Sequence, residues 1–220
     1  MTRLVVFDCD GTLVDSQHLI IEAMGLAFAA EGLHPPPDDA VRAVVGLSLA
    51  VAIGKLLPAA GAADCLRLAE HYKEAFHGIR QRPEFHEPLF DGAREGLRAL
   101  DRAGFVLAIA TGKGIRGLRA VLDHHGLGDL FQSLQTADHH PSKPHPAMLE
   151  AAIREAGSDP AQTWLVGDTS YDMLMARAAG VRPIGVAWGY HPADALRAAG
   201  AAVILERFDQ LLERLERRAA

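Results

Sequence analysis

The chain of 220 residues has only two cysteines, Cys9 and Cys65, and few aromatic residues. Two cysteines without metal-ligand spacing exclude a disulfide-stapled scaffold, and we expect both to be reduced thiols. No apolar run approaches the ~20 residues that a membrane-spanning helix needs, so no membrane partner is expected. The first apolar run, residues 4–7, is too short for a secretion signal. We therefore expect a cytoplasmic protein.

The sequence also lacks clusters of Lys and Arg. There are 22 basic residues against 28 acidic ones, and the formal net charge is −6. A mildly acidic chain without a basic cluster disfavours nucleic acid as a partner. Zinc is disfavoured too, because His124 and His125 are adjacent on an expected helix and point in different directions. With 49% hydrophobic residues, the composition is that of a globular protein with room for a second small domain.

Short continuous apolar runs recur along the chain, with amphipathic segments between them. This pattern is typical of parallel strands that helices cover on both faces. The expected strands are residues 4–7, 105–110, 131–134, 164–166, 184–187 and 201–205, and the expected helices among them are residues 92–103, 115–125 and 208–218. The sequence therefore predicts an α/β fold with a doubly wound parallel sheet.

Residues 16–86 break this alternation, because no strand pattern occurs there. Helical patterns occupy residues 17–31, 38–45, 48–57 and 63–79, with Ser16 and Asp38 expected as N-caps of the first two. An insertion of roughly 70 residues is long enough to bury its own core. We predict a Rossmann-like catalytic core at 1–15 and 87–220, and a smaller, all-helical cap domain at 16–86 over the end of the first strand.

Acidic and phosphate-binding residues follow several of the expected strands. The segment from Asp8 to Thr12 follows the first strand, Thr111 and Gly112 follow the second, and Asp168 and Asp172 follow the run at 164–166. In a doubly wound sheet these strand ends meet at one crevice. Carboxylates about 4 Å apart repel by about 4 kcal/mol at an effective dielectric of 20, so the cluster needs a cation. Oxygen-only ligands favour Mg²⁺.

The motif D-x-D-G-T at Asp8 to Thr12, followed in order by Thr111, Lys143 and the pair Asp168 and Asp172, resembles the four motifs of the haloacid dehalogenase superfamily of phosphatases. The resemblance spans the whole chain and includes a helical cap between the first two motifs. It implies that Asp8 attacks phosphorus and forms an aspartyl-phosphate. It also implies that Asp10 protonates the leaving oxygen and later takes a proton from water.

The resemblance implies roles for the remaining motif residues. Thr111, the Gly112 amide and Lys143 would hold the phosphoryl oxygens. Gly11 would allow a sharp turn, and Thr12 or the Asp10 amide would donate to the phosphate. The expected Mg²⁺ ligands are Asp8, Asp168 and Asp10, the last through its backbone carbonyl, whereas Asp172 would bind through water or orient Lys143.

The segment Gly46-Leu47-Ser48-Leu49 resembles the cap loop of phosphoglycolate phosphatases, which faces the active site. We therefore expect Gly46 near the phosphate and a small phosphorylated metabolite, phosphoglycolate-like, as substrate, with Arg42 and Lys55 as candidate anchors. Asp10 argues against a dehalogenase, since halide needs no protonation. A sugar-phosphate mutase, a pyrophosphatase, a phosphonatase using Lys55 or Lys73, and a non-catalytic binding module remain alternatives. The oligomeric state stays open.

Overall fold

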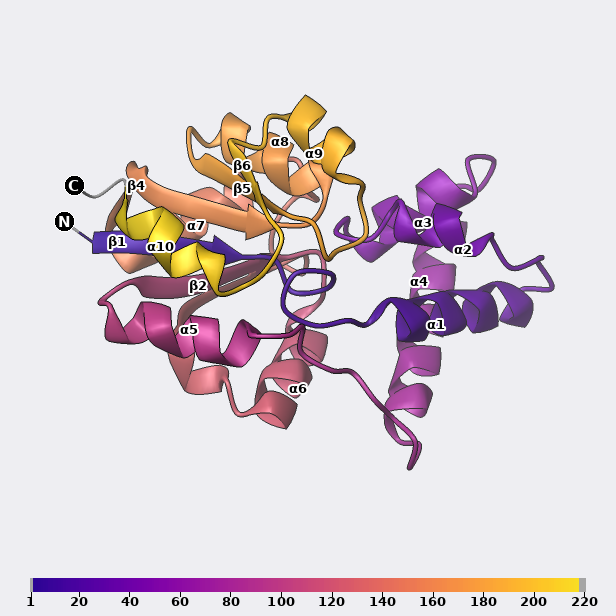
Figure 1. The fold of residues 1–220 in the computed structure, drawn as a ribbon. Helices are drawn as coiled ribbons and strands as arrows, with labels where there is room; N and C mark the ends of the chain where they lie inside the picture. The colour runs from indigo at the N-terminus through magenta and orange to yellow at the C-terminus, as the bar shows by residue number, and fades with distance from the viewer. Residues whose placement is uncertain (1, 218–220) are drawn as a thin grey trace.

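The computed structural model describes residues 2–217 and contains one six-stranded parallel sheet in the order β3-β2-β1-β4-β5-β6 (Figure 1). The strands are β1 (Thr2–Phe7), β2 (Val106–Thr111), β3 (Phe131–Thr136), β4 (Ser158–Gly167), β5 (Arg182–Val186) and β6 (Val203–Leu205). The predicted doubly wound α/β fold is confirmed. The strand order reverses at β1, so a crevice is expected where β1 and β4 end side by side.

Helices cover both faces of the sheet, and β1 shows why its sequence is apolar throughout. Val5 and Phe7 belong to one buried cluster and Leu4 and Val6 to the other, because successive side chains of a strand point to opposite faces. The helices packed in the first cluster are α5 (Ala93–Arg102), α6 (Ile115–His125) and α10 (Gln210–Glu216), and those in the second are α7 (Ala147–Ala156) and α8 (Ser170–Ala178). Helix α9 (Ala193–Ala199) packs against α8.

Four helices lie between β1 and α5, and we refer to them as the helical insertion: α1 (Gln17–Ala30), α2 (Asp38–Arg42), α3 (Leu49–Leu56) and α4 (Ala62–Arg80). They share an apolar core of their own, in which Met24 and Phe28 of α1 meet Ile53 of α3 and Leu68 of α4. The insertion lies beyond the carboxyl ends of the strands (Figure 1). It therefore covers the edge of the sheet at which the predicted site residues follow their strands.

Several predicted boundaries need correction. Helix α2 ends at Arg42, because the chain then turns and Gly46 adopts a φ of 93°. Strand β4 begins at Ser158, six residues before the apolar run, since Ser158 pairs with Thr2 before the register shifts. Helix α10 ends at Glu216, and Arg218 lies outside the described residues.

Of the two predicted N-caps, Ser16 stands at its predicted position without capping through its side chain, and Asp38 is wrong. Ser16 occupies the N-cap position of α1 but makes no capping hydrogen bond, because its hydroxyl donates to Asp10 Oδ1 at 2.6 Å. Asp38 is the first residue of α2, and Pro37 precedes it at the N-cap. Among the described residues, no helix combines the length and apolar character that crossing a bilayer requires.

Candidate active site

Three of the four predicted carboxylates meet in a buried cluster at the carboxyl ends of β1 and β4. Asp8 follows β1, Asp168 follows β4, and Asp172 lies in the first turn of α8. One carboxylate oxygen from each lies within 4.8 Å of the other two, and all three residues are fully buried. The topology of the sheet thus brings Asp8 to two residues that are 160 or more positions away in the sequence.

A buried lysine from the loop between β3 and α7 places its ammonium between two carboxylates of this cluster. Lys143 Nζ lies 2.9 Å from Asp8 Oδ1 and 2.7 Å from Asp172 Oδ1. Burial alone would lower the pKa of Lys143, but Asp172 and Asp8 raise that pKa above its ordinary range. The other oxygen of Asp172 accepts hydrogen bonds from Thr169 N at 3.1 Å and Thr169 Oγ1 at 2.6 Å. Asp172 thus joins the Lys143 ammonium to the first turn of α8, which suits it to orienting Lys143.

The charges of the cluster do not balance. With every group ionised, three carboxylates and one ammonium would leave two negative charges in a buried space, which is costly without a partner. Burial, followed by the charge of Asp172, raises the pKa of Asp8 to about 7 against the opposing effect of Lys143. Burial, Asp8 and Asp172 raise the pKa of Asp168 well above its ordinary value. Asp8 Oδ2 is buried and has no hydrogen-bond partner among the described residues.

This donor set fits a divalent cation. An unpartnered carboxylate oxygen, neighbouring carboxylates and an excess of two negative charges match a hard ion that binds oxygen, such as Mg²⁺. Two hydrogen bonds fix the orientation of the Asp168 carboxylate beside Asp8, as a metal ligand requires. Its Oδ1 accepts a hydrogen bond from Thr12 Oγ1 at 2.8 Å, and its Oδ2 accepts one from Tyr190 N at 2.9 Å. The expectation that the Thr12 hydroxyl donates to phosphate is therefore corrected: it donates to Asp168.

Gly11 is required at its position for two reasons. Its φ is 81°, in the left-handed region that residues with a Cβ rarely adopt. A Cβ added there would lie 2.2 Å from Asp168 Oδ2. The glycine of the first motif thus lets the loop after β1 approach the carboxylate that follows β4.

Asp10 lies outside the three-carboxylate cluster and contacts different groups. Its Oδ1 accepts the hydrogen bond from Ser16 Oγ and lies 3.1 Å from Lys113 Nζ. Asp10 also lines the cleft described next. The two aspartates of the first motif therefore face different partners, as two different chemical tasks would require.

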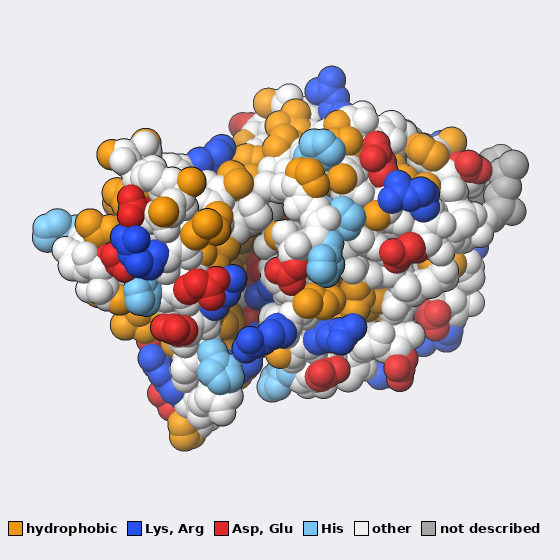
Figure 2. Space-filling model, turned by 180° about the vertical axis from the view of Figure 1, so that it is seen from behind, with side chains coloured by type: hydrophobic (Ala, Val, Ile, Leu, Met, Phe, Trp, Pro, Cys, Tyr) orange, Lys and Arg blue, Asp and Glu red, His pale blue; other side chains and the backbone are white. Residues whose placement is uncertain are grey.

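A cleft of about 1080 Å³ lies between the helical insertion and the core. Its lining includes Asp8, Asp10, Gly46, Thr111 and Gly112, together with apolar residues of α1 and α4. Seen from behind, the molecule is hollowed between these two parts, and Lys and Arg side chains gather at the lower end of the hollow (Figure 2). The cleft is large enough for a small phosphorylated metabolite and reaches the buried carboxylates.

The insertion contacts the core closely at one end of this cleft. A Cβ on Gly112 would lie 2.4 Å from Leu47 O and 2.6 Å from Gly46 O, and a Cβ on Gly46 would lie 3.8 Å from Asp8 Oδ2. Nearby, Ser48 N donates to Ser142 Oγ at 2.8 Å. The loop at 46–49, expected to face the site, does lie beside Asp8.

Sequence reasoning missed three charged residues beside Asp10. Lys113 Nζ is 3.9 Å from Glu87 Oε1, and Arg80 Nη2 is 2.8 Å from Glu87 Oε2. Lys113 stands two positions after Thr111, so a lysine close behind a strand end was an available signal. Glu87 lies outside any motif, and only the fold brings it to Lys113.

The candidate substrate anchors lie elsewhere, which corrects that expectation. Arg42 pairs with Gln17 and Asp38, Lys55 lies over the Tyr171 ring at 5.0 Å, and neither lines the cleft. Lys73 does line it, but its side chain is exposed and pairs with Glu70 at 2.7 Å. Neither Lys55 nor Lys73 has the desolvated surroundings that activate a Schiff-base lysine, which disfavours the phosphonatase alternative.

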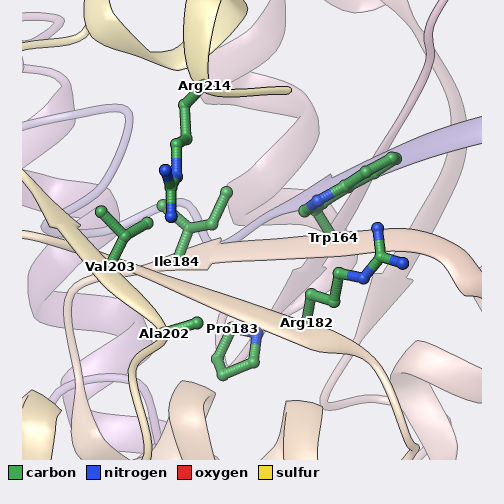
Figure 3. A pocket seen from close by; sticks show the side chains of 7 residues that line it. All are labelled: Trp164, Arg182, Pro183, Ile184, Ala202, Val203 and Arg214. Carbon is green, nitrogen blue, oxygen red and sulfur yellow. The ribbon is translucent and has the colours of Figure 1, made fainter. Parts of the chain in front are cut away.

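A second cavity is too small for a substrate. It measures about 10 Å³ and is lined by Trp164 of β4, residues of β5 and β6, and Arg214 of α10 (Figure 3). A volume of this size holds about one water molecule. Because the lining contains no acid and no nucleophile, the large cleft is the candidate active site.

Comparisons with known proteins show the family to which the chain belongs. The family model of haloacid dehalogenase-like hydrolases matches residues 5–186. The chain is 38% identical over 216 residues to "Probable phosphatase IndB" of Dickeya dadantii (strain 3937), covering 96% of this chain and 93% of that protein. It is 32% identical over 196 residues to a phosphoglycolate phosphatase of Pseudomonas fluorescens (strain Pf0-1), covering 87% of this chain and 71% of that protein.

Solved structures share the fold over nearly the whole chain. A hydrolase from Pseudomonas syringae superposes with a TM-score of 0.86 at 27% identity and covers 99% of both chains. The structure of a predicted phosphoglycolate phosphatase from Haemophilus somnus 129PT superposes with a TM-score of 0.85 at 23% identity. The match covers 96% of this chain and 97% of that one, and it supports the fold alone. From the match over residues 5–186 and the full-length relatives, the chain belongs to the haloacid dehalogenase-like hydrolases and resembles the phosphatases among them.

Proposed function

We propose that the protein is a Mg²⁺-dependent phosphatase that hydrolyses a small phosphate monoester through an aspartyl-phosphate on Asp8. The buried, unpartnered Oδ2 of Asp8 beside a cluster with two excess negative charges is the observation that carries the proposal. Asp8 also lines the cleft, so one residue combines access to substrate with a carboxylate oxygen that no protein group occupies.

The reaction has two steps on this chain's own residues. In the first, a carboxylate oxygen of Asp8 forms a bond to phosphorus, the ester P–O bond breaks, and the leaving oxygen takes a proton from Asp10. In the second, water attacks the phosphorus, Asp10 takes a proton from it, and the bond between phosphorus and Asp8 breaks. Inorganic phosphate and the free alcohol are the products.

Other residues would stabilise the charge on the phosphoryl group. Thr111 and Gly112 line the cleft next to Asp8, and we assign the Thr111 hydroxyl and the Gly112 amide to its oxygens. Lys143, 2.9 Å from Asp8, offsets the negative charge of the nucleophile and binds the phosphoryl oxygens. Gly46 has no side chain to block the space beside Asp8 Oδ2.

For the metal we assign Asp8, Asp168 and the backbone carbonyl of Asp10 as ligands, with Asp172 orienting Lys143 through its 2.7 Å contact. A bound Mg²⁺ would offset the excess negative charge so that an anionic phosphate ester can approach Asp8. Thr12 and the Tyr190 amide hold the orientation of Asp168.

We further propose that the helical insertion acts as a cap that closes over the substrate and meets the group attached to the phosphate. The names of the relatives make phosphoglycolate the first ester to test. The proposal includes a cytoplasmic location and neither nucleic acid nor membrane as partner.

Release of inorganic phosphate from a panel of esters, with and without Mg²⁺, tests the proposal. We expect Mg²⁺-dependent release that is selective among the esters and that Asp8→Asn abolishes, while circular dichroism shows an intact fold. Unchanged release by the Asp8→Asn variant would refute the mechanism. Conversion of a sugar phosphate into its isomer without free phosphate would identify a mutase instead.

A further inference from the structure

Lys113 is a buried cation that the proposed mechanism leaves without a role. It lies two residues after the end of β2, and only 11% of its side chain is exposed. Its ammonium lies 3.1 Å from Asp10 Oδ1, 3.9 Å from Glu87 Oε1 and 5.1 Å from the centre of the Phe76 ring. A lysine is rarely buried unless it is paired, so this placement indicates a specific task.

Lys113 contacts one oxygen of Asp10, which a second donor also binds. Two donors from different parts of the chain reach Oδ1: the Ser16 hydroxyl at the start of α1 and the Lys113 ammonium after β2. Neither contact involves Oδ2. Holding one oxygen from two directions restricts rotation of the carboxyl group and leaves Oδ2 available for a substrate in the cleft that Asp10 lines. Proton transfer demands such restriction, because donor and acceptor must lie within hydrogen-bond distance.

Lys113 is itself held in place from the insertion. Glu87, of which the side chain is 1% exposed, lies between α4 and α5 and is bound by Arg80 at the end of α4. Phe76 of α4 covers the ammonium from the same side. With two carboxylates beside it, Lys113 carries no surplus charge for an anionic substrate group. These contacts favour support of Asp10 over substrate binding.

We infer that Lys113 is a positioning residue that holds Asp10 in the orientation for protonating the leaving oxygen, an inference that rests on the proposed function. In that step the bond between Asp8 and phosphorus forms, the ester P–O bond breaks, and the proton of Asp10 moves to the leaving oxygen. Lys113 exchanges neither proton nor electrons; it acts through Asp10.

The dependence of the rate on the leaving group tests this role. An alkyl ester such as phosphoglycolate releases a basic alkoxide that needs a proton, whereas p-nitrophenyl phosphate releases a stabilised phenolate that does not. Because kcat/KM includes every step up to cleavage of the ester bond, we expect Lys113→Met to lower it about 100-fold for the alkyl ester, the size of effect that misplacing a reacting group by 1 Å can have. For p-nitrophenyl phosphate we expect less than about threefold, since the contribution of the general acid is absent.

Three further variants serve as a comparison, a rescue and a control. Asp10→Asn should show the same preference for the aryl ester more strongly, and Lys113→Arg should recover part of the alkyl-ester activity. Arg119→Met removes an exposed cation of α6 outside the cleft lining and should leave both esters unchanged. Should Lys113→Met fail to fold, Glu87→Gln weakens the support of Lys113 and should show the same preference to a smaller degree.

Equal losses for both esters, or no loss for either, would overturn the role assigned to Lys113. A rise in KM shared by both esters would mean that Lys113 binds the substrate phosphate and would likewise overturn it. A wild-type enzyme that hydrolyses no ester at any Mg²⁺ concentration would refute the proposed function itself, and the inference with it.

Discussion

The carboxylates of Asp8 and Asp168 are placed where the folded protein resists their ionisation. Burial raises both pKa values, that of Asp8 to about 7 from an ordinary value of 3.8. Between about pH 4 and pH 7 the folded protein therefore binds protons that the unfolded chain has released. This difference makes folding less favourable as pH rises through that range.

We expect metal-free protein to lose stability as pH rises from 5 to 8, by a few kcal/mol from Asp8 alone. Urea unfolding in EDTA, for wild type and for Asp8→Asn, isolates this contribution from other titrating groups. The difference in unfolding free energy should shift in favour of the variant as pH rises. A difference that stays constant, or shifts toward wild type, would contradict the raised pKa of Asp8.

A divalent cation should cancel the effect. At pH 8, Mg²⁺ at a hundred times its Kd adds about 2.7 kcal/mol to the unfolding free energy, because it binds only the folded state. We expect a thermal shift with Mg²⁺ for wild type and a much smaller one for Asp168→Asn. Equal shifts for both proteins would place the cation elsewhere.

Among single residues, the sequence predicted aspartates of the cluster because they follow apolar runs. Such runs form parallel strands, and the carboxyl ends of these strands meet at one crevice. Asp8 and Asp168 could be found in this way, whereas Lys143 was indicated only by the order of the family motifs. The contacts of Ser16 and Thr12 could not, because both hydroxyls bond to carboxylates, one six residues away and the other 156. Glu87 could not be predicted as a site residue, because its partner Lys113 is 26 positions away in the sequence and is close only in the folded chain.

At the scale of the elements, the loop between α2 and α3 approaches the residue that follows β2 closely. Gly112 has no positive φ, so alanine suits its backbone, yet an added Cβ would lie 2.4 Å from Leu47 O. The loop at 46–49 would have to move away from Asp8. Substitution here changes the docking of the insertion without touching the interior of either part.

We expect Gly112→Ala to lower kcat/KM by about 10- to 100-fold, because reacting groups displaced by 1 Å lose that much. Steady-state kinetics and a melting curve check this, and the melting temperature should change little. Gly78→Ala in α4 is the matched control, since a Cβ there meets no atom within 4 Å. That variant should keep full activity and gain about 0.5–1 kcal/mol of stability from helix propensity. Full activity of Gly112→Ala would show that the close approach at this loop is not needed for activity.

Element types were more predictable than element ends. The helices at 17–30, 62–80 and 93–102 follow from their apolar spacing, whereas α2 stops early because Gly46 must turn the chain toward the core. The first six residues of β4 have no apolar periodicity, and the two of them that pair with β1 are Ser158, with Thr2, and Thr163, with Leu4. Tertiary contacts decided both ends.

At the scale of the whole molecule, the segment that leads into the C-terminal helix packs on β1, the strand that precedes Asp8. Phe208, which precedes α10, stacks on Phe7 of β1 with ring centres 6.1 Å apart and planes 11° apart. Gly96 of α5 leaves room for this ring, since a Cβ there would lie 2.3 Å from Phe208 Cδ1. One aromatic side chain thus joins α5, α10 and β1 directly behind Asp8.

Phe208→Ala should therefore destabilise the protein by about 3–5 kcal/mol, as other buried phenylalanine truncations do. Denaturant unfolding measures this, and the released phosphate per folded molecule should stay close to wild type at low temperature. A loss below about 1 kcal/mol would mean that the Phe208 ring contributes little to the core.

The central claim is that Asp8 carries the phosphoryl group during turnover, and acid quenching tests it most directly. Wild type mixed with Mg²⁺ and a hydrolysed ester, quenched within milliseconds and analysed by peptide mass spectrometry, should carry phosphate on the peptide that contains Asp8. Asp8→Asn should carry none and release none. Rapid turnover by wild type with no phosphorylated peptide, or a phosphorylated peptide that persists in Asp8→Asn, would contradict the account.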